Sequence, residues 1–269
     1  MRFKACYNRL FLTGRSSKMD TKSLLRLAEE TALMAGKELI SNRKQWAVIE
    51  SEAGRDVKVK ADRLVEAIIL ENLQQATDFP ILTEERGWQV GVSDEHYLWV
   101  VDPLDGSFNY CSGMPACCVS IALYQADNPI LGVVYDFNRH ELFSGIVGEG
   151  AWLNRLDMRV STTAEMSRGV LQTGFPMQQS LSDQAFIEFM HFAGQWRKVR
   201  MIGSAALALA YVACGRADCY HENHTMFWDV AAGLVLVKAA GGAISMRGER
   251  LDARQNVYAS NGKVMPWVS

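Results

Sequence analysis

The sequence predicts a protein of the α+β class, and three observations support that prediction. Apolar residues recur at helical spacing over residues 20–42 and again over 61–76. Short apolar runs separated by turn residues follow one another over residues 117–144, which is typical of antiparallel strands. From residue 169 onward, strand-like runs alternate with helical segments. A sheet-rich first half and an alternating second half therefore indicate a mixed architecture.

Two amphipathic helices are predicted in the first half. The first is capped by Asp20 or Thr21 and runs to about Asn42, and the second covers about residues 61–76. Between them, residues 46–60 mix apolar residues with a glycine, which predicts a β-hairpin or an extended loop. The inward-facing residues are Leu24, Leu27, Ala28, Thr31, Ala35 and Leu39 in the first helix, and Leu64, Val65, Ile68 and Leu73 in the second.

Short strands surround these helices. A strand over residues 79–82 leads into Glu84 and Glu85, and adjacent glutamates after a strand are usually solvated. A turn at Asn128–Pro129 separates two later strands, and residues 148–160 are predicted to form a junction between the halves. The later strands are predicted at residues 117–124, 130–137 and 141–144.

The second half is predicted to alternate strands with helices. Gly203 and Ser204 start one helix, and Gly241–Gly242 ends another, as glycine commonly does at a helix C-terminus. Short strands close the chain. The predicted strands are residues 169–173, 197–202 and 218–222, and the predicted helices are residues 182–194, 203–214 and 227–240.

The centre of the chain is a predicted buried strand, because residues 99–101 are apolar and largely β-branched. It ends on Asp102, since Pro103 has no N–H for a sheet ladder. Asp105 follows three positions later, with the carbonyl of Leu104 in between. This oxygen-rich arrangement suits a hard cation such as magnesium. Taken alone, the two acids are equally well explained as ordinary turn residues.

Composition and charge exclude several classes of protein. The 269 residues are 49% hydrophobic and 22% charged, which indicates one large globular domain or two closely packed halves. A formal net charge of -2 argues against a nucleic-acid partner, and no apolar run is long enough to span a membrane. The 6 cysteines show no paired zinc spacing, which favours free thiols in a reducing compartment and hence a cytoplasmic protein.

Residues 1–18 differ from the rest because they carry basic residues and no acid. They are typical of an organelle leader, or of a disordered or dispensable tail upstream of a start at Met19, and the missing cleavage site favours the tail. The predicted organisation is therefore a basic tail over 1–19 and one domain over 20–269. Its halves are residues 20–155 and 156–269.

Acidic residues recur where strands end or helices begin. They are Glu84, the pair Asp102 and Asp105, and Asp229 in the first turn of a helix, with Asp62 as a candidate fifth. If they converge, each like-charge pair at contact distance costs roughly 4 kcal/mol at a surface-like effective dielectric. Such a cluster persists only if cations neutralise it or some acids stay protonated. Asp229 has an alternative structural role, since a carboxylate stabilises a helix N-terminus.

Several longer motifs accompany these acids. They are Asp-Pro-Leu-Asp-Gly-Ser at 102–107 followed by Asn109, Phe-Trp-Asp-Val-Ala-Ala-Gly at 227–233 with Ala-Ala-Gly-Gly at 239–242, Glu-Glu at 84–85, Ile-Gly-Ser-Ala-Ala at 202–206, and Ala-Asp-Cys-Tyr-His-Glu at 217–222. In this order they resemble the signatures of the inositol monophosphatase family, whose members are magnesium-dependent, lithium-sensitive phosphatases. The resemblance covers nearly all of residues 20–269.

The resemblance implies a layered αβαβα sandwich of the inositol monophosphatase and fructose-1,6-bisphosphatase type, usually a homodimer. It also implies two or three Mg²⁺ ions per active site. Glu84, Asp102 and the Leu104 carbonyl are expected to hold the first ion. Asp102, Asp105 and Asp229 are expected to hold the second, so that Asp102 bridges the pair.

The resemblance further implies the substrate and nucleophile sites. Phosphate oxygens are expected at the backbone amides of Gly106 and Ser107. We also predict that Asp62 and the Ser107 hydroxyl hydrogen-bond to each other and, with Glu84, orient the attacking water; alternatively both are simple helix caps. The expected substrate-facing residues are Asp105, Gly106, Ser107, Gly203, Ser204, Ala205, Glu222 and Asp229.

The expected function is a magnesium-dependent phosphomonoesterase acting on a small phosphorylated polyol, foremost myo-inositol monophosphate. Fructose 1,6-bisphosphate, another sugar phosphate or a 3'-phosphonucleotide are alternative substrates. A bisphosphate needs extra cationic residues, for which Lys198 and Arg200 are candidates unless they pair with surface acids. Ser107 where threonine is commoner, the bulky Phe108, and a short segment over residues 173–200 depart from the family pattern and leave the substrate open.

Two further classes were considered. An inactive metal-binding scaffold is disfavoured because every expected metal-binding acid and the Ser107 hydroxyl are present. A zinc site at His221 and His224 lacks helical spacing and a paired cysteine motif, which favours a structural or rim role for both. Nucleotide binding has no support in the sequence, since neither a Walker loop nor a glycine-rich dinucleotide-binding loop occurs.

Overall fold

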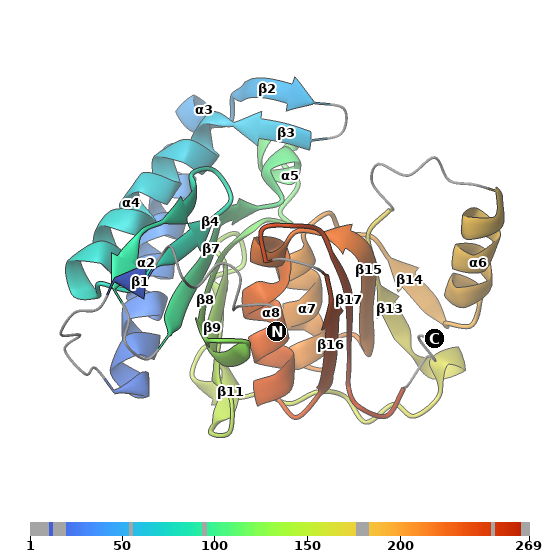
Figure 1. The fold of residues 1–269 in the computed structure, drawn as a ribbon. Coiled ribbons are helices and arrows are strands. Elements are labelled where there is room, and N and C mark those ends of the chain that lie inside the picture. The colour runs from blue at the N-terminus through green and yellow to red at the C-terminus, as the bar shows by residue number, and fades with distance from the viewer. Residues whose placement is uncertain are drawn as a thin grey trace.

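The computed structural model describes residues 11–12, 20–53, 56–92, 96–175, 183–248 and 251–264. Helices and sheets alternate in five layers (Figure 1). Helices α2 (Thr21–Ser41) and α4 (Lys60–Ala76) cover one side of a large sheet, and α7 (Ala205–Ala213) and α8 (Phe227–Ala239) lie between that sheet and a smaller one. Helix α6 (Asp183–Gly194) forms the last layer. The predicted αβαβα sandwich is therefore confirmed.

The large sheet has 8 strands in the order β12-β11-β10-β9-β8-β7-β4-β5. Antiparallel pairing joins β8 to β9 and β9 to β10, as predicted. Strand β7 pairs antiparallel with β8 on one side and parallel with β4 on the other. The strands are β4 (Ile81–Thr83), β5 (Gly87–Gln89), β7 (Tyr97–Asp105), β8 (Cys118–Gln125), β9 (Asn128–Asp136), β10 (Glu141–Ile146), β11 (Gly150–Leu153) and β12 (Leu156–Asp157).

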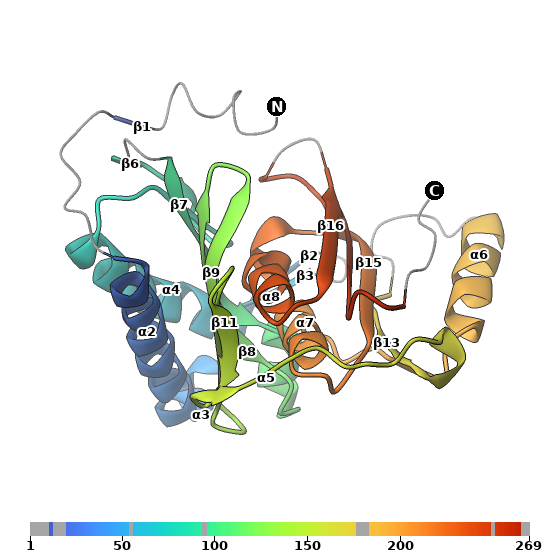
Figure 2. The ribbon, with the colours of Figure 1, turned by 90° about the horizontal axis from the view of Figure 1, so that it is seen from below.

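The smaller sheet has 5 strands in the order β14-β13-β15-β17-β16. Seen from below, it lies beyond α7 and α8 from the large sheet (Figure 2). Its strands are β13 (Val170–Gln172), β14 (Lys198–Arg200), β15 (Cys219–Thr225), β16 (Ala243–Arg247) and β17 (Gln255–Ser260). The short helices are α3 (Arg43–Trp46), α5 (Ser107–Ser112) and the 3-10 turn η1 (Met166–Arg168).

The predicted hairpin between the first two long helices is present as β2 (Ile49–Ala53) and β3 (Asp56–Val59). Two residues of the basic tail, Phe11 and Leu12, form β1 and pair in parallel with β6 (Gly91–Val92). The other residues of the tail lie outside the described part of the chain, and whether the tail is dispensable stays a prediction.

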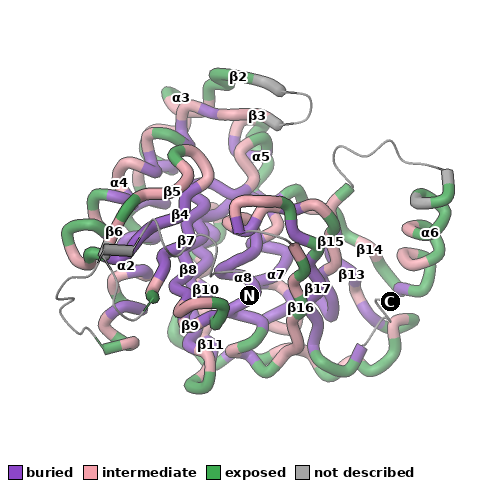
Figure 3. The backbone as a smooth tube through the Cα atoms, in the orientation of Figure 1, coloured by how far each residue is buried: buried purple, intermediate pink, exposed green. Residues whose placement is uncertain are grey.

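The hydrophobic core lies on both faces of the large sheet. Trp99 and Val101 of β7 pack with α2 and α4, while the alternate residues Leu98 and Val100 pack with α7 and α8. A strand that is buried on both faces appears in the sequence as a continuous run of apolar residues. Figure 3 shows this buried centre between more exposed outer helices. Among the described residues, no helix combines the length and apolar character needed to cross a bilayer.

Three local predictions are wrong. Strand β7 continues past Asp102 to Asp105, because a register shift against β8 between these two acids accommodates Pro103. The turn between β8 and β9 lies at residues 126–127, before Asn128, and Ala126 takes a positive φ of 52° there. The predicted junction over residues 148–160 contains β11 and β12, which extend the large sheet. The 5 described cysteines are free thiols, as predicted.

Candidate active site

Gly106 makes the turn between β7 and α5. Its φ is +87°, and a Cβ at this position would lie 2.7 Å from the carbonyl oxygen of Ala116. Both facts require glycine here. The turn places Ser107 at the first position of α5, directly after the two acids of β7.

The predicted hydrogen bond between Ser107 and Asp62 is present. Ser107 Oγ lies 2.9 Å from Asp62 Oδ1 and 2.8 Å from the carbonyl oxygen of Leu104. Asp62 Oδ2 accepts the backbone N–H of Val59 at 2.7 Å, so Asp62 also caps α4. Burial raises the pKa of Asp62 to about 7. Asp62 is thus both a cap and a base within reach of a hydroxyl.

Asp105 joins the two halves of the chain. Its Oδ2 accepts the Ser204 hydroxyl at 2.5 Å and the backbone N–H of Ala206 at 2.7 Å, while Oδ1 accepts the N–H of Ala205 at 3.3 Å. Burial raises the pKa of Asp105 to about 6, although these three donors oppose the shift. The carboxylate at the end of β7 is therefore fixed by the start of α7.

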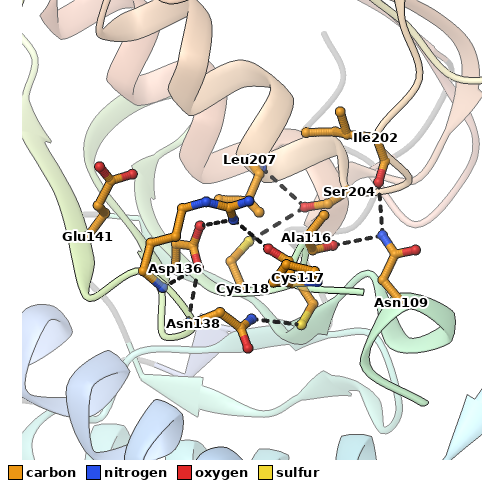
Figure 4. A network of polar contacts seen from close by, with 12 residues as sticks. Asn109, Ala116, Cys117, Cys118, Asp136, Asn138, Glu141, Ile202, Ser204 and Leu207 are labelled. Carbon is orange, nitrogen blue, oxygen red and sulfur yellow. Dashed lines mark hydrogen bonds and ion pairs between the residues drawn. The ribbon is translucent and has the colours of Figure 1, made fainter. Parts of the chain in front are cut away.

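A second contact between the halves lies beside the first. Asn109 Nδ2 donates to the carbonyl oxygens of Ala116 at 2.7 Å and Ile202 at 2.8 Å, and Figure 4 shows its side chain between them. In the same view, Ser204 Oγ lies near the Cys118 thiol and accepts the N–H of Leu207. The motif residue Asn109 is thus a structural bridge.

Glu84 and Asp229 complete the group of acids. Glu84 follows β4, and Asp229 lies in the first turn of α8, where its Oδ2 accepts from Thr225 Oγ1 and Met226 N, both at 3.1 Å. Burial and then the charge of Asp229 raise the pKa of Glu84 well above its usual range. Burial and then the charge of Asp105 raise the pKa of Asp229 to about 7.

Asp102 is 1% exposed, and its Oδ1 accepts the backbone N–H of Leu104 at 3.0 Å. Burial raises its pKa well above the usual range, and the charges of Glu84, Asp105 and Asp229 add to the shift. The structure therefore brings the four predicted acids within electrostatic reach of one another.

Glu222 faces the same region from β15. The Tyr220 hydroxyl donates to Glu222 Oε2 at 2.7 Å, and burial raises the pKa of Glu222 to about 7. Gly203, Ser204 and Ala205 approach from the start of α7. All four residues line one cavity.

The cavity has a volume of about 500 Å³. Three predicted metal-binding acids, Glu84, Asp105 and Asp229, line it, whereas Asp62, Asp102, Leu104, Gly106 and Ser107 are not among its lining residues. Its other lining residues, which the sequence did not single out as functional, include Lys58, Thr173, Gly174, Phe175, Trp228 and Arg254. Thr173, Gly174 and Phe175 are consecutive after β13, whereas Lys58 and Arg254 come from distant parts of the chain. None of these five stands in a motif, while Trp228 precedes Asp229 in a signature.

The remaining basic and histidine candidates lie as follows. Lys198 and Arg200 are exposed on the edge strand β14 and do not line the cavity. His221 Nδ1 lies 3.2 Å from the Val257 carbonyl oxygen, a structural contact. His224 lines the cavity rim.

The donor set fits a hard divalent cation, because four carboxylates and the Leu104 carbonyl offer only oxygen. Burial raises the pKa of each of the four acids, and a neighbouring acid's charge adds to the shift for Glu84, Asp102 and Asp229, so the ionised group is unfavourable without a compensating cation. Within the described residues, no three acidic, histidine or cysteine side chains are gathered as closely as around a bound ion. Carboxylates that repel one another are expected to draw together only around added positive charge.

Comparison with known proteins gives consistent matches. The description "Inositol monophosphatase family" matches residues 20–267. An inositol-1-monophosphatase from Synechocystis sp. is 41% identical over 256 residues, covering 92% of this chain and 88% of the relative. A relative named Nus factor SuhB, from Xylella fastidiosa, is 37% identical over 227 residues, covering 83% and 82%.

Solved structures agree with the sequence matches. The inositol monophosphatase from Anabaena (Nostoc) sp. superposes with a TM-score of 0.78 at 37% identity, covering 91% of this chain and 93% of that one. The fold is therefore shared with this solved structure over most of both chains.

Proposed function

The chain belongs to the inositol monophosphatase family, and we propose that it hydrolyses the phosphate monoester of a small polyol, foremost myo-inositol monophosphate, with Mg²⁺ as its cofactor. It is a phosphoric monoester hydrolase, and the family is metal-dependent. The choice of polyol, the identity of the metal and the residue roles below are our proposals.

One observation carries the proposal. Four acids beside the Gly106 turn have pKa values raised by burial, and for three of them a neighbouring acid's charge adds to the shift. Three of the four, Glu84, Asp105 and Asp229, line a cavity of about 500 Å³. Such a site is unfavourable unless cations are bound, and bound cations favour a dianionic ligand such as a phosphate monoester. The cavity wall also carries polar groups such as the Glu222 carboxylate, which can accept hydrogen bonds from the hydroxyl groups of a substrate. Such groups favour a polyol.

Five residues are proposed to hold the ions. Glu84, Asp102 and the Leu104 carbonyl hold one, and Asp102, Asp105 and Asp229 hold another, with two or three ions in all. When bound, magnesium supplies positive charge at the phosphoryl and leaving oxygens and lowers the pKa of water. Asp105 Oδ2 is already occupied by Ser204 and Ala206, which leaves Oδ1 as its freer oxygen.

Asp62 and Ser107 are proposed to orient and deprotonate the attacking water, with Glu84 beside them. The Ser107 hydroxyl donates to Asp62 Oδ1, so the lone pairs of its oxygen can accept a hydrogen bond from water. The water proton then passes through Ser107 Oγ to Asp62 Oδ1. A carboxylate with a pKa of about 7 suits this step at neutral pH.

The remaining groups are proposed to bind the substrate. The backbone amides of Gly106 and Ser107 take phosphate oxygens, in line with their place at the start of α5. Ser204, Ala205 and Glu222, which also line the cavity, contact the polyol. Since Lys198 and Arg200 lie away from the cavity, the basic pair first considered for a bisphosphate does not favour that substrate.

We propose a cytoplasmic homodimer without a nucleic-acid partner. The net charge of -2 supports the last point. Helix α6 supports the dimer, because Phe186, Ile187 and Met190 are each more than 40% exposed on it. Light scattering should give twice the mass of one chain. The mass of a single chain would instead favour a partner at α6 other than a second copy of this chain. Such a partner is of interest because some relatives carry the name Nus factor SuhB.

The test is phosphate release with Mg²⁺ over inositol phosphates, fructose 1,6-bisphosphate, other sugar phosphates and 3'-phosphonucleotides. We expect the highest kcat/KM for an inositol monophosphate, loss of activity with excess chelator, and inhibition by lithium and calcium. Calcium should inhibit because it accepts looser geometry than magnesium. Full activity in excess chelator would contradict the proposal, and no release from any ester would favour a scaffold.

A further inference from the structure

Glu66 is a buried acid that the proposed chemistry does not use. It lies in α4 and is 0% exposed. It does not line the cavity. A buried carboxylate is costly unless its oxygens are paired, so its partners indicate what it does.

Within the described residues, the polar partners of Glu66 belong to the turn that follows β4. Its Oε1 accepts the backbone N–H groups of Glu85 and Arg86, each at 3.2 Å. Its Oε2 lies 3.1 Å from Arg86 Nε, as an ion pair whose geometry does not meet that of a hydrogen bond. The Arg86 side chain is 49% exposed, so this ion pair is weakened by solvent. The two backbone contacts are therefore the main link.

These contacts bear directly on Glu84. The N–H of Glu85 belongs to the peptide unit that also contains the Glu84 carbonyl. Fixing that unit fixes the backbone on the C-terminal side of Glu84, and with it the direction of the Glu84 side chain. The turn is also held from the side by Lys58, whose Nζ lies 2.7 Å from Glu85 Oε1.

Glu66 lies one helical turn after Asp62 on the same face of α4. Asp62 holds the Ser107 hydroxyl, and Glu66 holds the turn that carries Glu84. Four residues of α-helix span about 6 Å. A single rigid helix therefore sets the spacing between the group that orients water and a carboxylate proposed to bind the first ion.

From this geometry we infer that Glu66 is a positioning residue for the metal site, which aims the Glu84 carboxylate by clamping the Glu84–Arg86 turn. The inference rests on the proposed function. Partners that orient a metal ligand typically change metal affinity by about 10–100-fold when they are removed. Removing Glu66 should therefore weaken Mg²⁺ binding, whereas the hydrogen bond between Asp62 and Ser107, which does not involve Glu66, should stay in place.

The test measures the Mg²⁺ dissociation constant by isothermal titration calorimetry and compares it with the Mg²⁺ dependence of activity. Glu66→Leu should raise the dissociation constant about tenfold or more. The value of kcat at saturating Mg²⁺ should stay within about threefold of wild type, because Glu66 does not touch the substrate cavity.

Two control variants separate positioning from general stability. Leu73→Ala removes a buried side chain from the same helix without touching the turn; it should lower Tm and leave the dissociation constant unchanged. Arg86→Met removes the ion pair but keeps both backbone N–H donors, so it should change the dissociation constant by less than about threefold.

Glu66→Gln keeps the side-chain volume in case the leucine variant does not fold. Its amide oxygen can still accept the two backbone N–H groups, but its NH₂ group then faces the Arg86 guanidinium. We expect weaker Mg²⁺ binding from this variant alone, because a neutral amide oxygen accepts the two backbone N–H groups less strongly than a carboxylate does. Binding should partly recover when Arg86→Met removes the facing donor.

A wild-type dissociation constant in Glu66→Leu or in Glu66→Gln would overturn the inference and leave the proposed function intact. An effect of Arg86→Met as large as that of the Glu66 variants would also overturn it, since the ion pair would then be the only active contact. A wild-type protein that neither binds Mg²⁺ nor hydrolyses any ester would contradict the proposed function itself.

Discussion

Ser107 Oγ lies 2.9 Å from Asp62 Oδ1, and this contact joins residues 45 positions apart, from α5 and α4. We predict that Ser107→Ala and Asp62→Asn each lower kcat by roughly 100-fold or more, the size of a lost acid–base contribution. The double variant should be little worse than either single one, because the two groups act as a unit. Steady-state kinetics at saturating Mg²⁺ measure these effects.

A matched control is available in Asp20, which caps α2 by accepting the N–H of Ser23 at 2.9 Å. Asp20→Ala should cost about 1 kcal/mol of stability and leave kcat unchanged. If Asp62→Asn behaves like Asp20→Ala, then Asp62 is only a helix cap.

Asp102 is proposed to bridge two ions, so Asp102→Asn should be the most damaging change for activity. The same change should raise the Tm of the metal-free protein, because it removes a buried acid that like charges surround. Thermal unfolding in excess chelator tests this point. A lower Tm together with lost activity would indicate that Asp102 is needed for folding instead.

The metal-free protein should become less stable as the pH rises. Folded-state pKa values of about 6 for Asp105 and about 7 for Asp62, Asp229 and Glu222 exceed the ordinary carboxyl values of about 4. The folded state therefore binds more protons than the unfolded state between about pH 4 and pH 7, and stability is lost as the pH rises through that window. In chelator, Tm should fall from pH 5 to pH 8.

Added Mg²⁺ should oppose this loss, since it binds the ionised carboxylates. The gain in Tm with Mg²⁺ should therefore be larger at pH 8 than at pH 5. A Tm in chelator that rises over the same interval would contradict the assignment of these shifts.

Gly174 lies against the Glu222 carboxylate, and a Cβ at this position would overlap Glu222 Oε1. Gly174→Ala should push that carboxylate out of place and raise KM roughly tenfold, the scale of one lost charged hydrogen bond. Tm should change little, because the displaced atoms are the carboxylate atoms at the end of the Glu222 side chain. Gly194→Ala is the control, since its Cβ meets nothing within 4 Å. Equal KM values for both variants would mean that Glu222 does not contact the substrate.

Deletion of residues 1–18 should leave folding and turnover unchanged, because the sequence shows no core pattern there. The pairing of β1 with β6 involves only Phe11 and Leu12. Circular dichroism and kcat/KM of a chain starting at Met19 check this. Insolubility or inactivity would reject the prediction, and import of a fusion into an organelle would support a leader.

Two of the helices were predictable because their signals are local: apolar spacing for the helix over 61–76, and the glycines at 241–242 for the helix that precedes them. The helix expected over residues 61–76 is observed as Lys60–Ala76, and the one expected over 227–240 as Phe227–Ala239. The end of β7 was not predictable from Pro103, since the register shift depends on pairing with β8. The positive φ of Ala126 likewise has no local signal, whereas Asn128–Pro129 offers a misleading one.

The site was predictable in part. The acids stand in motifs, and the Asp62–Ser107 hydrogen bond was expected from their proposed roles. Lys58 and Arg254 on the cavity wall, and Glu66 behind it, were missed. Each contributes to the site together with residues that are distant in the sequence and come close only in the folded chain. Nothing adjacent to Glu66 in the chain distinguishes it from a surface glutamate of an amphipathic helix.

Asp105 belongs to the first half of the chain, and three of its hydrogen-bond donors, at Ser204, Ala205 and Ala206, belong to the second. A cut in the segment between β12 and β13 would leave each fragment with only part of the acid group, since Asp229 is also in the second half. Neither fragment alone should release phosphate, whereas re-associated fragments should. If each fragment is fused to one of two interacting proteins, phosphate release would then report that these two proteins bind each other. The segment between β12 and β13 is therefore a suitable cut site for a split-protein reporter.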